Sequence, residues 1–311
     1  MSDYHVIAHA HGIYQLDADY IAEGLASVYL LEQQGRLAII ETGTASSAAH
    51  LLALIADLGY QPEQVDWIIL THIHLDHAAG AGTLMQHCPQ ATLVVHPRGA
   101  RHMIDPQKLE AGTRAVYGDE QYQALYGALV PVAAQRVMSV EDQQTLDFNG
   151  RTLTFFDTPG HALHHICIHD SASNAVFTGD TCGLSYRQFD DADGRPLLFV
   201  TTTPVHFDPQ AMRASINRIW ALQPEALYLT HFGPVAASDD NRQQLFASLE
   251  AFVALAQQQD DEASLTEAIL NWLTSQLTQR GLDGDQARRW LQTDARLNAQ
   301  GLLVWRQRQA G

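Results

Sequence analysis

The sequence is poor in cysteine and contains no long apolar run. Its 311 residues include three cysteines, Cys88, Cys167 and Cys182, and no two of them have the CxxC spacing. A sparse, odd-numbered set of cysteines does not form a disulfide framework, so we expect a reducing compartment. No segment approaches the run of about 18 uncharged apolar residues that a membrane span needs, and we expect none.

Basic residues are also scarce. Lys and Arg total 18 against 35 Asp and Glu, which gives a formal net charge of −17. Because nucleic acid and anionic membranes are bound through clustered Lys and Arg, we predict neither as a partner and expect a small-molecule substrate instead. The N-terminal segment has no charged region followed by an apolar stretch, so we expect no signal peptide and predict a cytoplasmic protein.

Hydrophobic residues make up 46% of the chain, enough for a sizeable core. Short apolar runs alternate with helical periodicity in both halves of the first 237 residues, which predicts two sheets packed face to face with helices outside. The expected strands are 26–31, 37–41, 65–70, 91–96, 152–157, 165–168, 174–178 and 226–230, and the expected helices include 45–58, 78–87 and 209–222. We predict one domain over 1–237, with a helical insertion at 98–130, and a helical extension over 238–311.

The residues after the apolar run at 65–70 carry the strongest chemical signal. The sequence THIHLDH begins there, with three histidines and one aspartate in six residues. Alternate side chains of an extended chain point the same way, so His72 and His74 should project together, while Asp76 and His77 face a second point. Imidazole and carboxylate suit zinc, iron and manganese. Four such ligands are too many for one tetrahedral ion with an open position, so the segment favours two ions.

This segment resembles the HxHxDH signature of the metallo-β-lactamase superfamily. Further motifs follow in that family's order: TPGH ending at His161, GD ending at Asp180, and TH ending at His231. The resemblance spans roughly residues 20 to 235. It implies an α/β protein with the αββα sandwich of that superfamily, here followed by a C-terminal helical extension.

Carried over by position, the resemblance implies two divalent transition-metal ions, for which zinc is the first expectation and iron or manganese the alternatives. The implied ligands of one ion are His72, His74 and His161, and those of the other are Asp76, His77 and His231. Asp180 would bridge the two ions.

Two further residues are expected to support these ligands without binding metal. Glu41 stands in an ETG turn where the family usually has DTG, so its carboxyl is one methylene longer than usual. The segment TPGHALHHICI is similar to the glyoxalase II pattern TPGHTxGHI. His161 and His165 match that pattern, whereas Ala162 and His164 depart from it, and we expect a supporting role for His165.

The resemblance implies a hydrolase that cleaves a small-molecule acyl bond by attack of a metal-bridging hydroxide, with Asp76 orienting that nucleophile and shuttling a proton. The similarity to glyoxalase II favours a thioester, and an ester or a lactone is also possible. Lactone hydrolases of the superfamily carry HxHxDHxGG, which this chain meets in part. Two alternatives remain: an iron sulfur dioxygenase that oxidises persulfides through His72, His161 and Asp180, and a metal-binding regulatory protein with little turnover.

The substrate pocket is expected to use the long segment 183–209, since loops of this length are usually functional. The residues expected to line it are Tyr186, Arg187, Phe189, His206 and Phe207. Plain packing is the alternative for these aromatic rings. The apolar positions of the helical tail must be buried somewhere, either over the site or in a homodimer contact.

Overall fold

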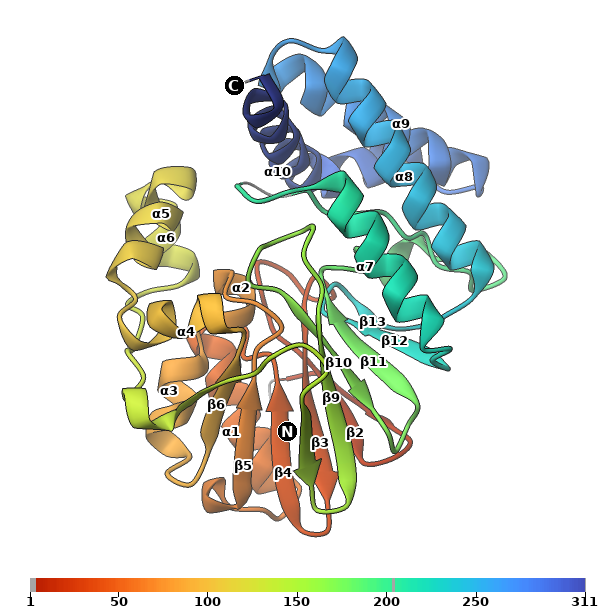
Figure 1. The fold of residues 1–311 in the computed structure, drawn as a ribbon. Coiled ribbons are helices and arrows are strands. Elements are labelled where there is room, and N and C mark those ends of the chain that lie inside the picture. The colour runs from red at the N-terminus through yellow and green to blue at the C-terminus, as the bar shows by residue number, and fades with distance from the viewer. Residues whose placement is uncertain (1–3, 203–204, 311) are drawn as a thin grey trace. The chain divides into compact units, whose positions relative to one another are not determined.

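The computed structural model describes residues 4–202 and 205–310, which form two compact units (Figure 1). The first unit contains the chain up to Asp157, together with His164–Gly179 and Thr230–Gly233. The second contains Thr158–Leu163, Asp180–Leu229 and the chain from Pro234 onward. The chain therefore crosses between the units several times, always next to one of the motifs singled out in the sequence.

The first unit is built on a seven-stranded sheet with the order β1-β2-β3-β4-β5-β6-β7. Strands β1 to β4 pair antiparallel, and β4 to β7 pair parallel. The strands are β1 (Val6–His9), β2 (Ile13–Asp17), β3 (Ser27–Gln33), β4 (Arg36–Ile40), β5 (Val65–Ile69), β6 (Thr92–Val95) and β7 (Val137–Ser139). In the parallel half of the sheet, the carboxyl ends of β4, β5 and β6 lie at the same edge.

A second group of strands in this unit pairs antiparallel in the order β8-β9-β10-β11. These are β8 (Thr145–Phe148), β9 (Arg151–Asp157), β10 (Ile166–Asp170) and β11 (Ala175–Gly179). The ring of Tyr29 on β3 meets that of Phe177 on β11 edge-on, with centroids 5.2 Å apart. The Arg151 guanidinium donates to the carbonyl oxygen of His11 at 2.8 Å. The two sheets thus pack face to face, as the sequence predicts.

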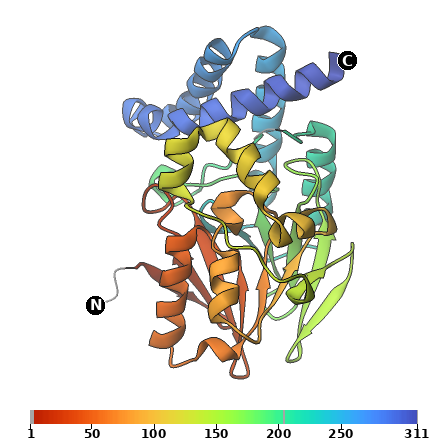
Figure 2. The same ribbon diagram turned by 90° about the vertical axis from the view of Figure 1, so that its left-hand side faces the viewer.

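The outer face of the seven-stranded sheet is covered by helices (Figure 2). Leu30, Ile39 and Ile68 point to that face and share a buried core with Leu51 and Ile55 of α1. The helices of this unit are α1 (Ala45–Asp57), α2 (Leu75–Ala78), α3 (Ala81–His87), α4 (Pro97–Ile104), α5 (Gln107–Tyr117) and α6 (Asp119–Leu125), with 3-10 turns η1 (Pro62–Gln64) and η2 (Ala134–Arg136). Strand side chains alternate between this core and the layer between the sheets, which gives the αββα arrangement.

The second unit is mainly helical and includes the predicted C-terminal helices. Its elements are η3 (Arg187–Phe189), α7 (Pro209–Ala221), β12 (Ala226–Leu229), β13 (Gly233–Ala236), α8 (Asp239–Gln258), α9 (Glu262–Gln279) and α10 (Gly284–Ala310). Leu245 and Leu249 of α8 are buried, and Phe252 packs edge-on against Trp272 of α9 with centroids 5.6 Å apart. The apolar faces of the tail are therefore largely buried within this unit. A domain boundary at 237 and the insertion at 98–130 stay predictions.

The structure differs from the expected elements in two ways. The helix expected over 78–87 begins later, as α3, and Ala78 is the last residue of the separate helix α2. Gly80, between the two helices, lies against the segment that follows β4. A Cβ there would lie 2.5 Å from the Thr44 carbonyl oxygen. Strands β1, β2, β7, β8 and β13 were not expected from the sequence pattern. Across the described residues, no helix is both long and apolar enough to cross a membrane.

A buried ion pair between β9 and β10 offers a test of what stabilises the second group of strands. Nε and Nη2 of Arg151 donate to the two carboxylate oxygens of Asp170 at 2.7 and 2.6 Å, and both side chains are fully buried. Burial opposes ionisation of Asp170, but hydrogen bonds from Arg151 and Ser173 outweigh it, so the pKa of this carboxyl lies below its ordinary value.

We expect Asp170→Asn to lower the free energy of unfolding at neutral pH by about 3–5 kcal/mol, because the guanidinium stays buried without its counter-charge. Since the folded-state pKa is lowered, this stabilisation is present above the unfolded pKa of about 3.9 and is lost as the pH falls through the folded value. In urea titrations the gap between wild type and variant should narrow below about pH 4.

The matched control is Glu250→Gln, which removes an exposed partner of Arg213. This change should alter the free energy of unfolding by less than about 0.5 kcal/mol. Equal losses in the two variants, or a gap that does not depend on pH, would contradict the role given to the buried pair.

Candidate metal centre

Polar side chains gather where the parallel strands of the first unit end. Glu41 follows β4, Thr71 and His72 follow β5, and His96 follows β6. Because the carboxyl ends of parallel strands meet at one edge of a sheet, these residues come together although they are far apart in sequence. Most of the site residues predicted from the HIHLDH segment therefore share one edge, next to the start of α2.

The Glu41 carboxylate is the centre of this edge and is almost completely buried. It accepts hydrogen bonds from the hydroxyl of Thr71, from the Thr71 backbone N–H at 3.3 Å, and from the Thr230 hydroxyl at 3.3 Å. Nδ1 of His77 lies 3.0 Å from the same carboxylate. One side chain thereby connects the ends of β4 and β5, helix α2 and the segment that carries His231.

His77 and His231 each form a hydrogen bond through one ring nitrogen and turn the other nitrogen toward Asp76. Nδ1 of His77 donates to Glu41, and Nδ1 of His231 donates to the carbonyl oxygen of Leu25 at 2.7 Å. These acceptors select the Nδ1–H tautomer, which leaves a lone pair on Nε2. Oδ2 of Asp76 lies 3.6 Å from Nε2 of His77 and 3.4 Å from Nε2 of His231.

These separations fit a tetrahedral metal ion. Ligand atoms about 2.0–2.1 Å from zinc and about 109° apart lie roughly 3.3–3.4 Å from each other. The Asp76 contacts to His77 and His231 come close to that value, and the ligand atoms of the three residues lie within 4.8 Å of one another. The donor set, one carboxylate and two neutral imidazoles, suits a divalent transition metal.

His72 and His74 form a second pair in the first unit. Nε2 of His72 lies 2.9 Å from Nδ1 of His74, and Nδ1 of His72 lies 3.1 Å from the Thr71 hydroxyl. The ring of His165 stacks behind that of His72, with centroids 4.9 Å apart. Glu41, His72 and His77 also meet the spacing of a metal group, but the carboxylate of Glu41 is already occupied by four hydrogen bonds. We therefore assign Glu41 to support and not to metal binding.

The GD turn begins with Gly179, a position where only glycine fits. Its φ of +49° is in the left-handed region, and a Cβ at this position would lie 2.4 Å from the Thr71 hydroxyl and 2.6 Å from Nε2 of His165. A side chain would therefore push against the groups that support His72.

The second unit holds the other two predicted ligands, His161 and Asp180. Nε2 of His161 lies 3.4 Å from Oδ2 of Asp180, and both side chains are buried. Nδ1 of His161 faces the carbonyl oxygen of Thr201 at 3.3 Å, so this histidine shows the same division of its nitrogens as His77. The assignment of these two residues to the same centre as the histidines of the first unit stays a prediction.

The TPGH turn that carries His161 is seated on α7. Gly160 has a φ of +135°, and a Cβ there would lie 2.4 Å from the backbone nitrogen of Met212. The Ser215 hydroxyl donates to the Pro159 carbonyl oxygen at 2.6 Å, and the backbone N–H of Asp208 donates to that of Gly160 at 2.8 Å. Glycine is required at this turn because the helix backbone leaves no room for a side chain.

Comparison with known proteins decides the family. A profile of the metallo-β-lactamase superfamily matches residues 21–231, more than half of the chain. The chain belongs to the metallo-β-lactamase superfamily. This result confirms the resemblance that the HIHLDH segment and the later motifs indicate.

Individual relatives agree with this assignment. The metallo-β-lactamase fold-containing protein ST1585 from Sulfurisphaera tokodaii is 27% identical over 216 residues, which cover 68% of this chain and 74% of the relative. A hydroxyacylglutathione hydrolase from Salmonella paratyphi A is 30% identical over 184 residues, and the match spans 56% of each protein. The chain thus covers little more than half of the length of that second relative.

Solved structures of the superfamily share the fold. The crystal structure of ST1585 covers 94% of this chain and 99% of its own, with a TM-score of 0.63 and 21% identity. A metallo-β-lactamase family protein from Thermus thermophilus covers 96% of this chain and 94% of its own, with a TM-score of 0.66 and 21% identity. The coverage extends over nearly the whole chain, so the superfamily fold with added C-terminal helices is shown.

The residues predicted to line the substrate pocket of this superfamily member all belong to the second unit. Tyr186, Phe189 and Phe207 are buried, whereas Arg187 and His206 are partly exposed. The Tyr186 hydroxyl donates to Asp294 of α10 at 3.0 Å, and Phe207 lies edge-on to Trp305. Residues 203 and 204 of the predicted loop lie outside the described residues. A substrate pocket made by this segment stays a prediction.

The pairing of Tyr20 with Tyr126, near Asp76, was not expected from the sequence. The hydroxyls of Tyr20 and Tyr126 are 2.7 Å apart and nearly buried, although 106 residues separate them. Burial, followed by the negative charge of Asp76, raises the pKa of the Tyr20 phenol well above its ordinary value, so it stays protonated. The pair joins the loop after β2 to the end of α6, and no local sequence pattern could have indicated it.

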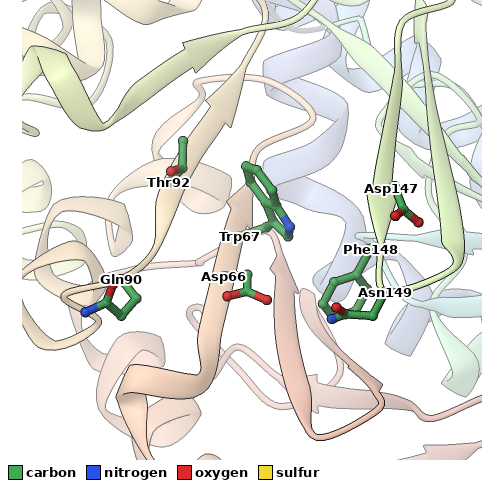
Figure 3. A pocket seen from close by; sticks show the side chains of 7 residues that line it. All are labelled: Asp66, Trp67, Gln90, Thr92, Asp147, Phe148 and Asn149. Carbon is green, nitrogen blue, oxygen red and sulfur yellow. The ribbon is translucent and has the colours of Figure 1, made fainter.

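A surface pocket of about 310 Å³ lies elsewhere in the first unit. Figure 3 shows Trp67 near its centre, with Asp66 below it, Gln90 to one side and Phe148 and Asn149 to the other. Trp67 and Asp66 come near the start of β5, whereas the histidines follow its end. The pocket is therefore at the opposite end of the strand from the metal-type residues, and we do not assign a catalytic role to it.

The four hydrogen bonds of Glu41 lead to a prediction about metal affinity. Glu41→Gln turns amide hydrogens toward groups that are themselves donors, so His77 and the segment after Thr230 lose a shared anchor. We expect the affinity for zinc to fall about 10–100-fold, measured by competition with a chromophoric chelator.

Exposed Glu63, mutated to Gln, is the control, and the unfolding free energy of each metal-free protein is measured alongside. If Glu41→Gln bound zinc as tightly as the control, the carboxylate could not be the support described here.

Proposed function

We propose that this protein is a dinuclear metal-dependent hydrolase that cleaves a small-molecule acyl bond, with a thioester favoured over an ester or a lactone. The proposal is supported by membership of the metallo-β-lactamase superfamily and by the candidate metal-binding groups. The observation that carries it is the position of Asp76, whose Oδ2 lies within 3.6 Å of the Nε2 atoms of two oriented imidazoles.

The ligands of the two ions are, in this proposal, those of the superfamily motif. His72, His74 and His161 hold one ion, Asp76, His77 and His231 hold the other, and Asp180 belongs to both. When bound, such ions supply an activated water at neutral pH and polarise the acyl oxygen. The acceptors Glu41, Leu25 and Thr201 orient these imidazoles, so that each Nε2 faces its proposed ligand point.

Asp76 combines proximity to the imidazoles with access to solvent. Its side chain is 21% exposed, whereas those of His77 and His231 are 0% and 7% exposed. In the proposed reaction the Asp76 carboxylate takes a proton from the water that attacks the acyl carbon. It returns this proton to the leaving thiolate or alkoxide, so the products are a carboxylic acid and a thiol or an alcohol.

The preference for a thioester rests on the hydroxyacylglutathione hydrolases among the relatives, about 30% identical over part of their length. The TPGHALHHICI segment matches the corresponding pattern at His161 and His165 but carries His164 where that pattern has glycine. His164 lies next to His74, with ring centroids 5.6 Å apart. An imidazole beside the ligands narrows the space there, so we expect an acyl group different from that of the relatives.

The proton transfer gives the first test of the proposal. Asp76→Asn should lower kcat about 10²–10⁴-fold on the best substrate from a panel of thioesters, esters, lactones and lactams. Metal content is measured on the same samples, so that loss of an ion is separated from loss of the base. A wild-type protein that retains metal but hydrolyses no member of the panel would favour the regulatory alternative.

Metal stoichiometry gives the second test. Elemental analysis of protein purified without added metal or chelator should find about two divalent ions per chain, mainly zinc. His231→Ala should retain about one ion, whereas the exposed control His87→Ala should retain two. One iron per chain, with no uptake of a second ion when metal is offered, would replace the hydrolase by the iron dioxygenase alternative.

A further inference from the structure

The C-terminal helix α10 carries a fully buried asparagine that binds the backbone of a distant segment. Oδ1 of Asn298 accepts from the backbone N–H of Thr202 at 2.6 Å and from the Thr202 hydroxyl at 2.9 Å. The same hydroxyl lies 2.9 Å from the carbonyl oxygen of Asn298, and Nδ2 of Asn298 donates to the carbonyl oxygen of Asp294. Oδ1 of this side chain therefore holds Thr202, while Nδ2 ties the amide to its own helix.

The neighbouring residues show that this contact is one of a regular series. Every second backbone N–H of the segment 198–202 donates to a helix side chain. Leu198 donates to Gln244 of α8 at 3.1 Å and Val200 to Ser248 of α8 at 3.0 Å. Thr202 donates to Asn298 of α10 at 2.6 Å. The backbone N–H of Phe199 donates to Leu184 on the other side. Alternation with a period of two is that of a strand. The segment 198–202 is thus an extended edge whose missing partner strand is replaced by helix side chains.

The end of this edge holds a predicted metal ligand. The carbonyl oxygen of Thr201 lies 3.3 Å from Nδ1 of His161, whose Nε2 faces Oδ2 of Asp180 at 3.4 Å. A carbonyl at Nδ1 selects the Nδ1–H tautomer and fixes the ring plane, which directs the Nε2 lone pair toward the ligand point. The position of that carbonyl depends on Thr202, the next residue, and therefore on Asn298.

We propose that Asn298 is a positioning residue for His161, acting through Thr202 and the Thr201 carbonyl, so that helix α10 forms part of the support of the metal centre. The inference rests on the proposed function, because it takes His161 to be a metal ligand. It assigns a task to the C-terminal extension, which lies outside the segment 21–231 that matches the superfamily profile.

The test compares two buried asparagines of the same unit. Asn298→Leu removes the acceptor for Thr202 with little change in volume. Asn241→Leu is the matched control, because Asn241 is also buried and donates to a backbone carbonyl, that of Ala236. Its link to the segment 198–202 is indirect, through Gln244, and reaches Leu198 and not Thr202. Both variants should be less stable than wild type, but only Asn298→Leu should weaken zinc binding, by about 10–100-fold in chelator competition.

A double-mutant cycle shows whether the effect passes through His161. In a His161→Ala background, Asn298→Leu should cause no further loss of zinc affinity, whereas independent effects would multiply. Thr202→Val is a milder variant that removes the hydroxyl contacts but keeps the backbone N–H, and it should give a smaller loss in the same direction. Equal losses of affinity from Asn298→Leu in both backgrounds, or equal affinities of Asn298→Leu and Asn241→Leu, would overturn the inference.

A measurement without metal separates this inference from the proposed function. In metal-free protein the imidazole ¹⁵N shifts of His161 should report the Nδ1–H tautomer in wild type and in Asn241→Leu, and a tautomer mixture in Asn298→Leu. The same tautomer in all three proteins would refute the positioning role even if the enzyme is active. A wild-type protein that binds no zinc, iron or manganese but shows this shift pattern would keep the positioning role for His161 and refute the hydrolase proposal.

Discussion

The buried carboxylate of Glu41 is the interaction on which the candidate metal centre depends. It is held at the end of β4 in a left-handed backbone conformation, with a φ of +65°, and it satisfies donors from three other segments of the chain. A buried carboxylate is costly unless it is fully hydrogen-bonded, so these donors and the acid require one another. The contacts to Thr71, His77 and Thr230 bring together residues that are up to 189 positions apart. This single carboxylate therefore fixes the relative positions of Thr71, His77 and Thr230 at the sheet edge.

The part of the site that could be predicted from the sequence is the part encoded by short motifs. Strand β5 is a compact apolar run, and His72, His74, Asp76 and His77 follow it directly, so both the strand and the grouping of these side chains follow from local periodicity. Strands β1 and β2 were missed because their residues mix polar and apolar types without clean alternation. The Tyr20–Tyr126 pair and the contact of Asn298 with Thr202 depend on tertiary packing, and nothing local in the sequence indicates them.

In both units a hydrogen-bond acceptor at Nδ1 orients each of these histidines, but the acceptors are held in place by different elements. In the first unit Nδ1 of His77 donates to Glu41 and Nδ1 of His231 donates to the Leu25 carbonyl, and both acceptors lie at the sheet edge. In the second unit the acceptor is the Thr201 carbonyl, which is held by helix side chains. The superfamily fold thus accounts for the first arrangement, while the second relies on helices that follow the matched segment.

The unequal exposure of Asp76 and its neighbouring imidazoles bears on how an ion would enter and leave the first unit. Solvent reaches the carboxylate, whereas the ring of His77 is enclosed and that of His231 nearly so. A chelator would therefore meet the aspartate first and would have to detach it before it could reach the histidines. Detachment of this one carboxylate would then be the first step by which the ion is released, and the two nitrogen bonds behind it would break only afterwards.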